Sequence, residues 1–406
     1  MNNSYLNQIL KLVLLLIVFI HPTISASAQS EEATLQESYY ENGAIKATYY
    51  ILNEKVDGEY NEFYDNGQLK IWCTFKNDLQ EGAYKDYFEN GTVFHNSFYK
   101  NGKLDGLFQE YNKNGTLNIS SFYKNGKKDG LHKQYNDDGV LELSINFKMG
   151  IKDGVSEIYY DNGQVFKKRY YIQGERQGSF IQYQRSGLKR MEGNMVNNEQ
   201  EGPWKLYEYD TGLLEKEYTF KEGKIVGREL FYYYFDNGSL HYTETLIGFS
   251  TAITEGDIIK DGPTTYYYEN GQVEKIGDYL NNKKIGNWKH YYKNGQLEKT
   301  GDFNEGDYTG IWEMYYDNGQ LQEKASYVMG KYNGTIKVYH KNGQLKTEGI
   351  AIMNNAEGLL TYYHDNGQIE STGNWTAGKQ EGEFKYYTKA GAIEKTELWE
   401  NGVLIN

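Results

Sequence analysis

The sequence predicts an all-β fold, an elongated and solenoid-like array of antiparallel β-hairpins that follows a signal peptide. Three observations predict it: an unusual composition, one short motif repeated along the chain, and strand-like alternation between the repeats. The 406 residues include 45 Gly and 41 Tyr but only 3 Pro. Aromatic residues make up 16% of the chain, which argues against wholesale disorder, and the scarcity of proline excludes a collagen-like chain.

The repeated motif is a turn of the form Tyr-x-Asp/Glu-Asn-Gly-Gln-Leu, and it recurs from the signal peptide to the end of the sequence. Its glycine stands at positions 43, 67, 91, 115, 139, 163, 187, 212, 238, 271, 295, 319, 343, 367 and 391. The steps are 24 residues long, apart from three of 25, 26 and 33 residues. A second glycine follows 15 residues later in the regular units, for example at Gly106 and Gly130. Such a period indicates a quasi-one-dimensional array in which each unit contacts its neighbours.

Each unit is predicted to be one β-hairpin and a connecting turn, giving about 30 strands in a strongly twisted meander. The Asn-Gly pair of the motif predicts a tight primed turn, because such a turn needs positive φ at both central residues. The second turn predicts a longer loop that ends on a left-handed glycine. Between the turns the pattern has period two, as in Trp288, His290 and Tyr292.

An aromatic residue stands five positions after each second glycine and forms a row at fixed register. Neighbouring rings of the row should lie two strands apart, about 10 Å, so each is expected to pack on the intervening strand. The members of this row are Phe63, Tyr87, Tyr111, Tyr135, Tyr159, Tyr183, Tyr207, Tyr232, Tyr267, Tyr291, Tyr315, Tyr339, Tyr363 and Tyr387.

The repeat spacing divides the chain into four segments. Residues 1–28 are predicted to be a signal peptide, and 29–187 and 263–406 to be regular hairpin repeats. The three irregular steps fall between Gly187 and Gly271, and 188–262 is predicted to hold irregular repeats with an insertion around 247–256. This insertion is expected to be a tolerated loop or a bend between two regular blocks, although loops on a rigid scaffold also carry function.

The signal peptide is predicted from an apolar run, Leu12 to Ile20, that follows Lys11 and precedes a small-x-small site at residues 26–28. This run is too short to span a bilayer as a helix. We therefore expect an exported protein that is periplasmic, at the cell surface or extracellular, with no membrane span once the signal is removed. An uncleaved anchor is the alternative.

Charge and cysteine content limit the partners further. The chain has 43 Lys and Arg against 56 Asp and Glu, a formal charge of -13, which argues against nucleic acid and anionic lipid surfaces as partners. Cys73 is the single cysteine, so no intramolecular disulfide can form, and it is expected to be a small packed residue.

No catalytic, cofactor or metal site emerges from the motifs, and we expect a protein that is not an enzyme. His340 and His364 occupy one repeat position about 10 Å apart, too far to share a zinc ion, and are interpreted as replacements of a Tyr. The regularly spaced carboxylates, such as Asp57 and Glu81, are interpreted as turn residues. The candidate partner-binding residues are four aromatics: Trp204, Phe249, Trp288 and Trp312.

The units at 301–319 and 373–387 resemble MORN-variant repeats, the hairpin repeats of bacterial proteins labelled YwqK-type antitoxin components. They depart from the standard MORN pattern because Gly-x-Trp or Gly-x-Phe replaces Gly-x-Gly, as at Trp288, Trp312 and Phe384. The resemblance implies a non-enzymatic binding module and, by its label, toxin neutralisation. We therefore expect an exported scaffold for protein–protein interaction, for which the family label suggests a role of the immunity or antitoxin type. The alternative is glycan or cell-wall binding through the aromatic rows.

Overall fold

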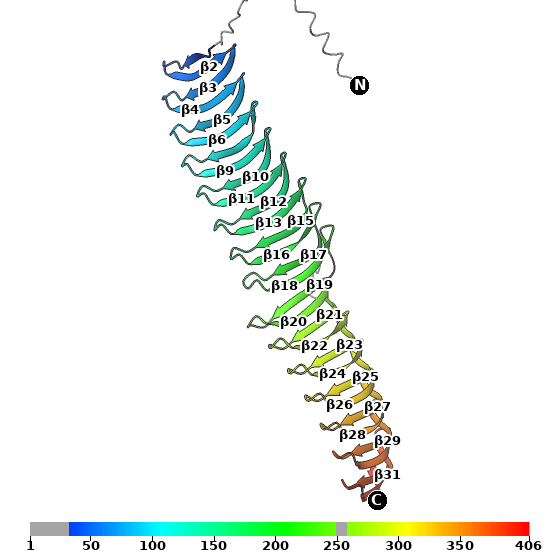
Figure 1. The fold of residues 1–406 in the computed structure, drawn as a ribbon. Coiled ribbons are helices and arrows are strands. Elements are labelled where there is room, and N and C mark those ends of the chain that lie inside the picture. Colours follow the sequence, from blue (N-terminus) through cyan, green and yellow to red (C-terminus); the bar gives the residue numbers. More distant parts are fainter. Residues whose placement is uncertain (1–31, 249–257, 406) are drawn as a thin grey trace, which may run out of the picture. The chain divides into compact units, whose positions relative to one another are not determined.

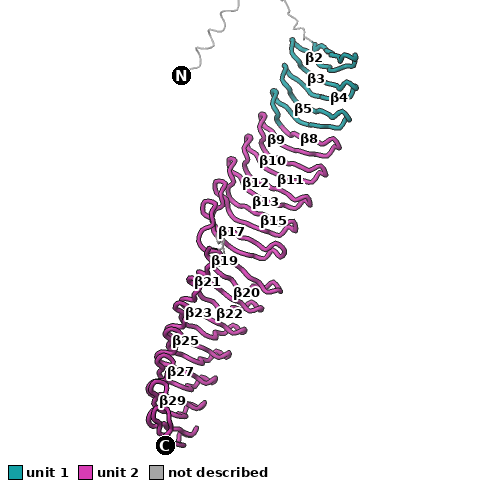
Figure 2. Tube along the Cα trace, turned by 180° about the vertical axis from the view of Figure 1, so that it is seen from behind, with its two compact units in different colours: residues 1–105 teal, residues 106–406 magenta. Residues whose placement is uncertain are grey.

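The computed structural model describes residues 32–248 and 258–405, which contain strands and turns and no helix. The all-β prediction is therefore confirmed. The predicted signal peptide and Phe249 lie outside the described residues. The chain forms two compact units, residues 1–105 and 106–406, drawn in teal and magenta in Figure 2. The boundary between these units, at 105/106, differs from the predicted segment boundaries at 187 and 263, which rest on repeat spacing alone.

In the first unit, each strand pairs antiparallel with the next one along the chain. Its strands are β1 (Thr34–Tyr39), β2 (Ile45–Leu52), β3 (Lys55–Phe63), β4 (Leu69–Lys76), β5 (Leu79–Tyr87), β6 (Val93–Lys100) and β7 (Lys103–Leu104).

The second unit is a meander of consecutive antiparallel hairpins, with strands that lie side by side in chain order (Figure 1). Its strands are β8 (Gly106–Tyr111), β9 (Leu117–Lys124), β10 (Lys127–Tyr135), β11 (Leu141–Lys148), β12 (Ile151–Tyr159), β13 (Val165–Ile172), β14 (Glu175–Arg176), β15 (Gly178–Tyr183), β16 (Lys189–Val196), β17 (Glu199–Tyr207), β18 (Leu214–Lys221), β19 (Lys224–Tyr234), β20 (Leu240–Ile247), β21 (Ile259–Tyr267), β22 (Val273–Leu280), β23 (Lys283–Tyr291), β24 (Leu297–Asn304), β25 (Asp307–Tyr315), β26 (Leu321–Val328), β27 (Lys331–Tyr339), β28 (Leu345–Ile352), β29 (Asn355–Tyr363), β30 (Ile369–Thr376), β31 (Lys379–Tyr387), β32 (Ile393–Glu400) and β33 (Val403–Leu404).

The prediction of the two turn types was wrong, because the structure has them in the reverse positions. In the motif turn only the glycine is left-handed: Gly163 has φ +81°, and its N–H donates to the carbonyl of Tyr160 at 3.0 Å. This is a three-residue loop closed by a left-handed glycine, and the Asn162 side chain accepts a hydrogen bond from Gln164 N. The tight two-residue turn is the other one, where Gln173 and Gly174 both have positive φ. The second glycine lies after this turn, inside the following strand, as Gly154 does in β12.

The core is built from large side chains that lie over small residues of the preceding strand. Trp312 on β25 covers Gly301 on β24, and a Cβ added to Gly301 would come within 2.2 Å of the indole. Four other pairs with the same spacing of eleven residues repeat this arrangement: Gly193 with Trp204, Gly277 with Trp288, Gly349 with Leu360, and Gly373 with Phe384. Cys73 takes the small position opposite Tyr60 and is 2% exposed, which confirms its prediction as a packed residue. The predicted aromatic row is half-buried throughout.

Two ladders of side-chain hydrogen bonds connect many of the neighbouring repeats. In the side-chain ladder, the first residue of a motif turn donates to a carbonyl one repeat further on, as Tyr292 Oη does to Tyr315 O at 2.7 Å. His340 and His364 hold this position through Nε2, which confirms that they replace Tyr. In the carboxylate ladder, acids such as Asp57 and Glu81 accept from backbone N–H groups of the next tight turn, which confirms their interpretation as turn residues. Members of the side-chain ladder are Tyr40, Tyr64, Tyr160, Gln184, Tyr268, Tyr292, Tyr316, His340 and His364.

Removing one bond of the side-chain ladder is expected to cost about 1 kcal/mol of unfolding free energy. The change Tyr292→Phe keeps the ring and deletes the hydroxyl that bonds to the half-buried carbonyl of Tyr315. Urea unfolding of the chain from Gln29 onward should show a lower midpoint at unchanged slope. Tyr209→Phe is the control, because Tyr209 is 60% exposed. Equal midpoints for the two variants would contradict the ladder as a stabilising element.

Two histidines give the fold a predictable dependence on pH. Burial, reinforced by Lys128, lowers the pKa of His132 to about 4. Burial also lowers the pKa of His290 to about 4, with Lys299, Lys284 and Lys275 adding to the effect. Their pKa in an unfolded chain is close to 6.5, so on acidification the unfolded chain takes up protons before the folded one does.

Stability contributed by these neutral histidines is therefore present above pH 6.5 and is lost as the pH falls from 6.5 towards 4. The expected loss is about 2 kcal/mol for each histidine. Urea midpoints at pH 7 and pH 4.5 should differ less in the double variant His132→Gln, His290→Gln than in the original chain. Other groups titrate in both proteins alike, so an identical pH dependence would reject the assignment.

Candidate functional site

Two of the three irregular steps of the repeat fall between β17 and β20, inside the second unit. Eleven residues separate Gly227 from Gly238, whereas nine separate Gly154 from Gly163 in a regular repeat. The two additional residues lengthen β19 to 11 residues. The strand ends with Tyr232-Tyr233-Tyr234, and Phe235 follows it directly. The turn that precedes β18 is also one residue longer, which accounts for the 25-residue step between Gly187 and Gly212.

The side-chain ladder changes at this place. Gln184 still reaches forward to Glu208 O at 2.8 Å, but the next two ladder positions hold Glu208 and Phe235. An ionised carboxylate and a phenyl ring have no proton to donate, so neither can form the ladder bond. A bond in the opposite direction replaces it, in which Tyr234 Oη donates to Leu214 O at 2.8 Å. The ladder resumes at Tyr268.

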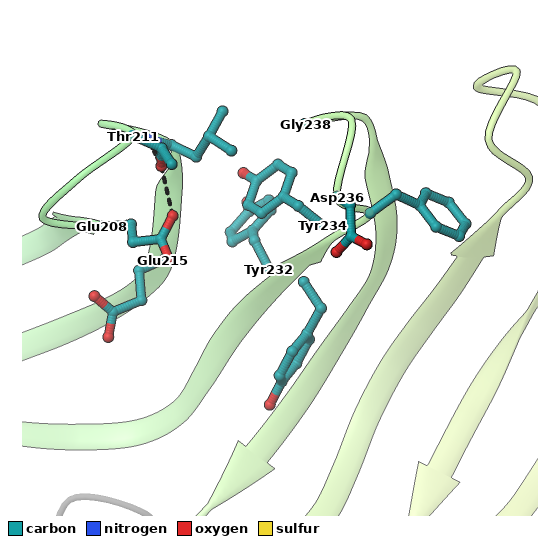
Figure 3. A pocket seen from close by; sticks show the side chains of 10 residues that line it. Glu208, Thr211, Glu215, Tyr232, Tyr234, Asp236 and Gly238 are labelled. Atoms are coloured by element: carbon teal, nitrogen blue, oxygen red, sulfur yellow. Dashed lines mark hydrogen bonds between the residues drawn. The ribbon is translucent and has the colours of Figure 1, made fainter.

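A cavity of about 560 Å³ lies where the ladder is interrupted, and we call it the tyrosine pocket. Figure 3 shows Glu208 and Glu215 on one side and Tyr232, Tyr234 and Asp236 on the other. The first wall is the turn before β18 together with the start of that strand, and the second wall is the end of β19 and its turn. Repeat spacing thus creates a concave site within an otherwise regular array.

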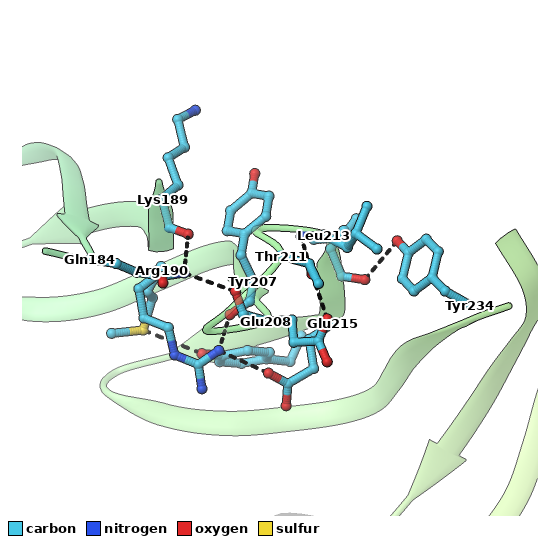
Figure 4. A network of polar contacts seen from close by, with 12 residues as sticks. Gln184, Lys189, Arg190, Tyr207, Glu208, Thr211, Leu213, Glu215 and Tyr234 are labelled. Atoms are coloured by element: carbon cyan, nitrogen blue, oxygen red, sulfur yellow. Dashed lines mark hydrogen bonds and ion pairs between the residues drawn. The ribbon is translucent and has the colours of Figure 1, made fainter. Parts of the chain in front are cut away.

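A network of polar contacts holds the first wall in place, as Figure 4 shows. Arg190 on β16 forms an ion pair with Glu215 at 2.9 Å and also donates to the carbonyl of Tyr207. Thr211 donates to the Glu208 carboxylate. Glu215 is therefore neutralised by a cation. Among the described residues, neither Glu208 nor Asp236 forms an ion pair, so these two carboxylates leave the pocket with negative charge.

The second wall contains the rings of Tyr232, Tyr233 and Tyr234, and a ring stack outside the pocket supports Tyr233. Tyr233 lies parallel to Tyr242, with ring centroids 4.2 Å apart, and Tyr242 stacks on Tyr266 at 5.3 Å. Burial and then the nearby Glu217 raise the pKa of Tyr232 to about 12, and burial followed by Tyr242 raises the pKa of Tyr233 to about 12. These phenols are neutral at physiological pH, so the pocket offers rigid aromatic surface, hydroxyl groups and two carboxylates.

The strands beside the pocket carry charges in the core. Glu229 is 2% exposed and pairs with Lys216 at 2.9 Å. Asp261 pairs with Arg228, and Glu244 pairs with Lys260, and both carboxylates are buried. We expect such pairs to favour one register of neighbouring strands, because a shifted register would leave a buried charge without its partner.

The three predicted binding residues that lie in the described part of the chain are all in the core. Trp204, Trp288 and Trp312 are at most 1% exposed. Trp288 and Trp312 lie in one cluster with Phe303, whereas Trp204 lies in another with Phe180 and Phe220. A partner could stack on these indoles only if the array opened, so they serve as packing residues in this structure.

Sequence reasoning missed the residues of the tyrosine pocket. A signal for them was present: Glu208 and Phe235 break the column of ladder donors, and three consecutive tyrosines coincide with the elongated spacing before Gly238. Within 32–248 and 258–405, no group of three or more His, Cys, Asp or Glu side chains is arranged to hold a metal ion. Nor does this part of the chain contain a helix long and apolar enough to cross a membrane.

Comparison with protein families gives ten matches to the MORN repeat variant, and together they span more than half of the chain. They fall on either side of 174–259, the segment that contains the tyrosine pocket. The matched residues are 56–77, 80–101, 104–125, 128–149, 152–173, 260–281, 284–305, 308–329, 332–350 and 356–377. No curated protein matches the sequence.

Comparison with solved structures gives matches at low identity and low TM-score. The crystal structure of TcdB2-TccC3 is 12% identical with a TM-score of 0.21, and the match covers 91% of this chain and 23% of that one. The Tc holotoxin pore of Photorhabdus luminescens is 11% identical with a TM-score of 0.18, and its match covers the same shares. This chain thus spans less than a quarter of the chains that it matches.

Proposed function

We propose that this chain, which belongs to the family of MORN repeat variant proteins, is an exported, non-enzymatic scaffold that binds a protein partner through the tyrosine pocket. A role of the immunity or antitoxin type fits such a scaffold. Repeat arrays offer long surfaces of fixed curvature, and a local irregularity gives one place on that surface a distinct shape. The partner would be met after export, outside the cytoplasm.

The observation that carries this proposal is the pocket at the interrupted ladder. Tyrosine is enriched at protein interfaces because it offers a large rigid surface with a hydroxyl group at little entropic cost. Glu208 and Asp236 add negative charge beside Tyr232 and Tyr234. A Lys or Arg side chain of the partner would satisfy both features, through an ion pair and a contact with an aromatic face.

Affinity capture tests the proposal. The chain from Gln29 to Asn406 is immobilised and exposed to periplasmic and extracellular fractions, and bound proteins are identified by mass spectrometry. We expect a stoichiometric protein partner. Recovery of none, combined with pelleting of the chain by purified wall polysaccharide, would favour glycan binding through the aromatic rows and overturn the proposal.

The double variant Glu208→Gln, Asp236→Asn locates the binding site once the partner is recovered. It should weaken binding at least tenfold in calorimetry, since it removes both unpaired charges and keeps the pocket's shape. Glu269→Gln is the matched control, because Glu269 occupies the turn position of Asp236 in the next unit and is exposed. Equal losses in both variants would place the interface elsewhere on the array.

A further inference from the structure

A second cavity, of about 410 Å³, lies among β13 to β17 and shares no residue with the tyrosine pocket. We call it the basic cavity. Lys167 and Arg169 alternate along β13 and therefore project to one face of the sheet, and Arg176 on β14 joins them in the lining. Phe180, Met191, Met195 and Trp204 supply the apolar part of the lining. The remaining lining is polar, and Glu199 is its single carboxylate.

The cations of this cavity outnumber its carboxylates, since Lys167, Arg169 and Arg176 share the lining with Glu199 alone. Arg176 donates to the carbonyl of Asn198 at 3.0 Å, and the Arg169 guanidinium lies 5.9 Å from the centre of the Phe180 ring. Lys168, which points to the other face, pairs with Glu157 at 2.9 Å. By contrast, within the described residues no carboxylate forms an ion pair with Lys167, Arg169 or Arg176. Burial and then Arg169 lower the pKa of Lys167, as expected for a cation without a counter-charge.

Two buried donors at the cavity also have no acceptor. Trp204 is 1% exposed, and its Nε1 forms no hydrogen bond with any described residue. The equivalent nitrogens of Trp288 and Trp312 donate to backbone carbonyls at 3.2 and 3.0 Å. Arg169 Nε is likewise buried and without an acceptor. Buried donors are nearly always satisfied, so these two leave room for an acceptor from outside the chain, either a water or a ligand.

We propose that the basic cavity binds a carboxylate attached to an apolar side chain. A carboxylate only accepts hydrogen bonds, and its two oxygens match the forked donors of a guanidinium. It would meet Arg169 and the indole N–H of Trp204, while the apolar group would lie on Phe180, Met191 and Met195. The cavity has room for one residue-sized group rather than a long chain. The same chemistry occurs at the end of a polypeptide and in a free apolar carboxylic acid.

Calorimetry with small probes tests this inference without any knowledge of the natural ligand. N-acetyl-phenylalanine should bind, whereas its amide and acetate should bind at least tenfold more weakly, because each lacks one half of the recognised group. Binding of the amide as tightly as the acid would overturn the proposal, as would inorganic phosphate binding as tightly as the acid. An octapeptide ending in phenylalanine separates the sources: if it binds like the acid, polypeptide ends are ligands, and if it is excluded, the ligand is a free acid.

Two variants and a spectroscopic readout locate the probe. Arg169→Gln should reduce affinity for N-acetyl-phenylalanine at least tenfold, whereas Arg185→Gln should not, since Arg185 is exposed and paired with Asp161. If Arg169→Gln does not fold, Lys167→Met removes a second cation from the same face. In a chain labelled with ¹⁵N-tryptophan, the probe should shift the Trp204 indole N–H resonance downfield and leave that of Trp312 unchanged. An unshifted Trp204 resonance at saturating probe would contradict the proposed position.

Discussion

Replacing Gly301 by alanine is expected to destabilise the second unit by about 3 kcal/mol, although the change adds only one methyl group. The new Cβ would stand 2.2 Å from Cδ2 of Trp312 and 2.4 Å from its Cγ. Trp312 is fully buried and stacks on Tyr308 with ring centroids 3.8 Å apart, so its indole has no free space to move into. Overpacking of this kind costs more than the small gain in helix or strand propensity that alanine offers over glycine.

The backbone plays no part in this effect, which makes the prediction a clean test of packing. Gly301 does not have positive φ, so alanine is allowed by its conformation. One repeat further along, Ala325 takes the same position opposite Ile336. The array therefore already contains the pair that the variant needs, with a smaller side chain in place of the indole.

A double-mutant cycle uses that natural pair. Gly301→Ala should cost far less when Trp312→Ile is present, because the added methyl group then meets a branched aliphatic chain instead of a ring. Urea unfolding followed by circular dichroism measures all four proteins. Additive losses would show that the indole is not what excludes a side chain at 301. Gly349→Ala should be intermediate, since its closest neighbour is the flexible Leu360 at 2.6 Å.

The sequence allowed the repeat length, the strand alternation and the half-buried aromatic row to be predicted, because each follows from periodicity alone. The sequence did not show which glycine belongs to the tight two-residue turn, since Gly163 and Gly174 both have positive φ. The two turns differ in the preceding residue, because Gln173 has positive φ and Asn162 does not. The burial of Trp312 could have been read from the glycine eleven residues earlier, which recurs before Trp204 and Trp288.

The tyrosine pocket and the basic cavity are of a different kind. Glu208 and Phe235 can be recognised in the sequence as ladder positions that lack a donor. The position of the turn after the longer β19, however, depends on contacts such as that of Tyr234 with Leu214. The unpaired state of Trp204 Nε1 depends on a missing backbone acceptor. Neither property can be predicted from residue type or repeat spacing.

Removing the ammonium of Lys216 is the second large effect that we expect, a loss of about 3 to 5 kcal/mol. Lys216→Met keeps a long side chain between the rings of Tyr218 and Phe231, over which the ammonium lies at 5.0 and 5.2 Å. It leaves Glu229, only 2% exposed, without the cation that stands 2.9 Å away. A buried charge that loses its partner retains its full desolvation cost.

The loss of stability in Lys216→Met should be much larger than the loss caused by breaking a surface ion pair. Lys283→Met breaks the pair with Glu305, where both side chains are more than half exposed, and should change the urea midpoint little. The double variant Lys216→Met, Glu229→Leu removes both buried charges and should recover most of the stability, because two apolar side chains can fill the same space. If the double variant is as unstable as Lys216→Met alone, the loss comes from packing of the lysine stem and not from the charge of Glu229. In that case the charged core beside the tyrosine pocket would not be what fixes the register of β18 and β19.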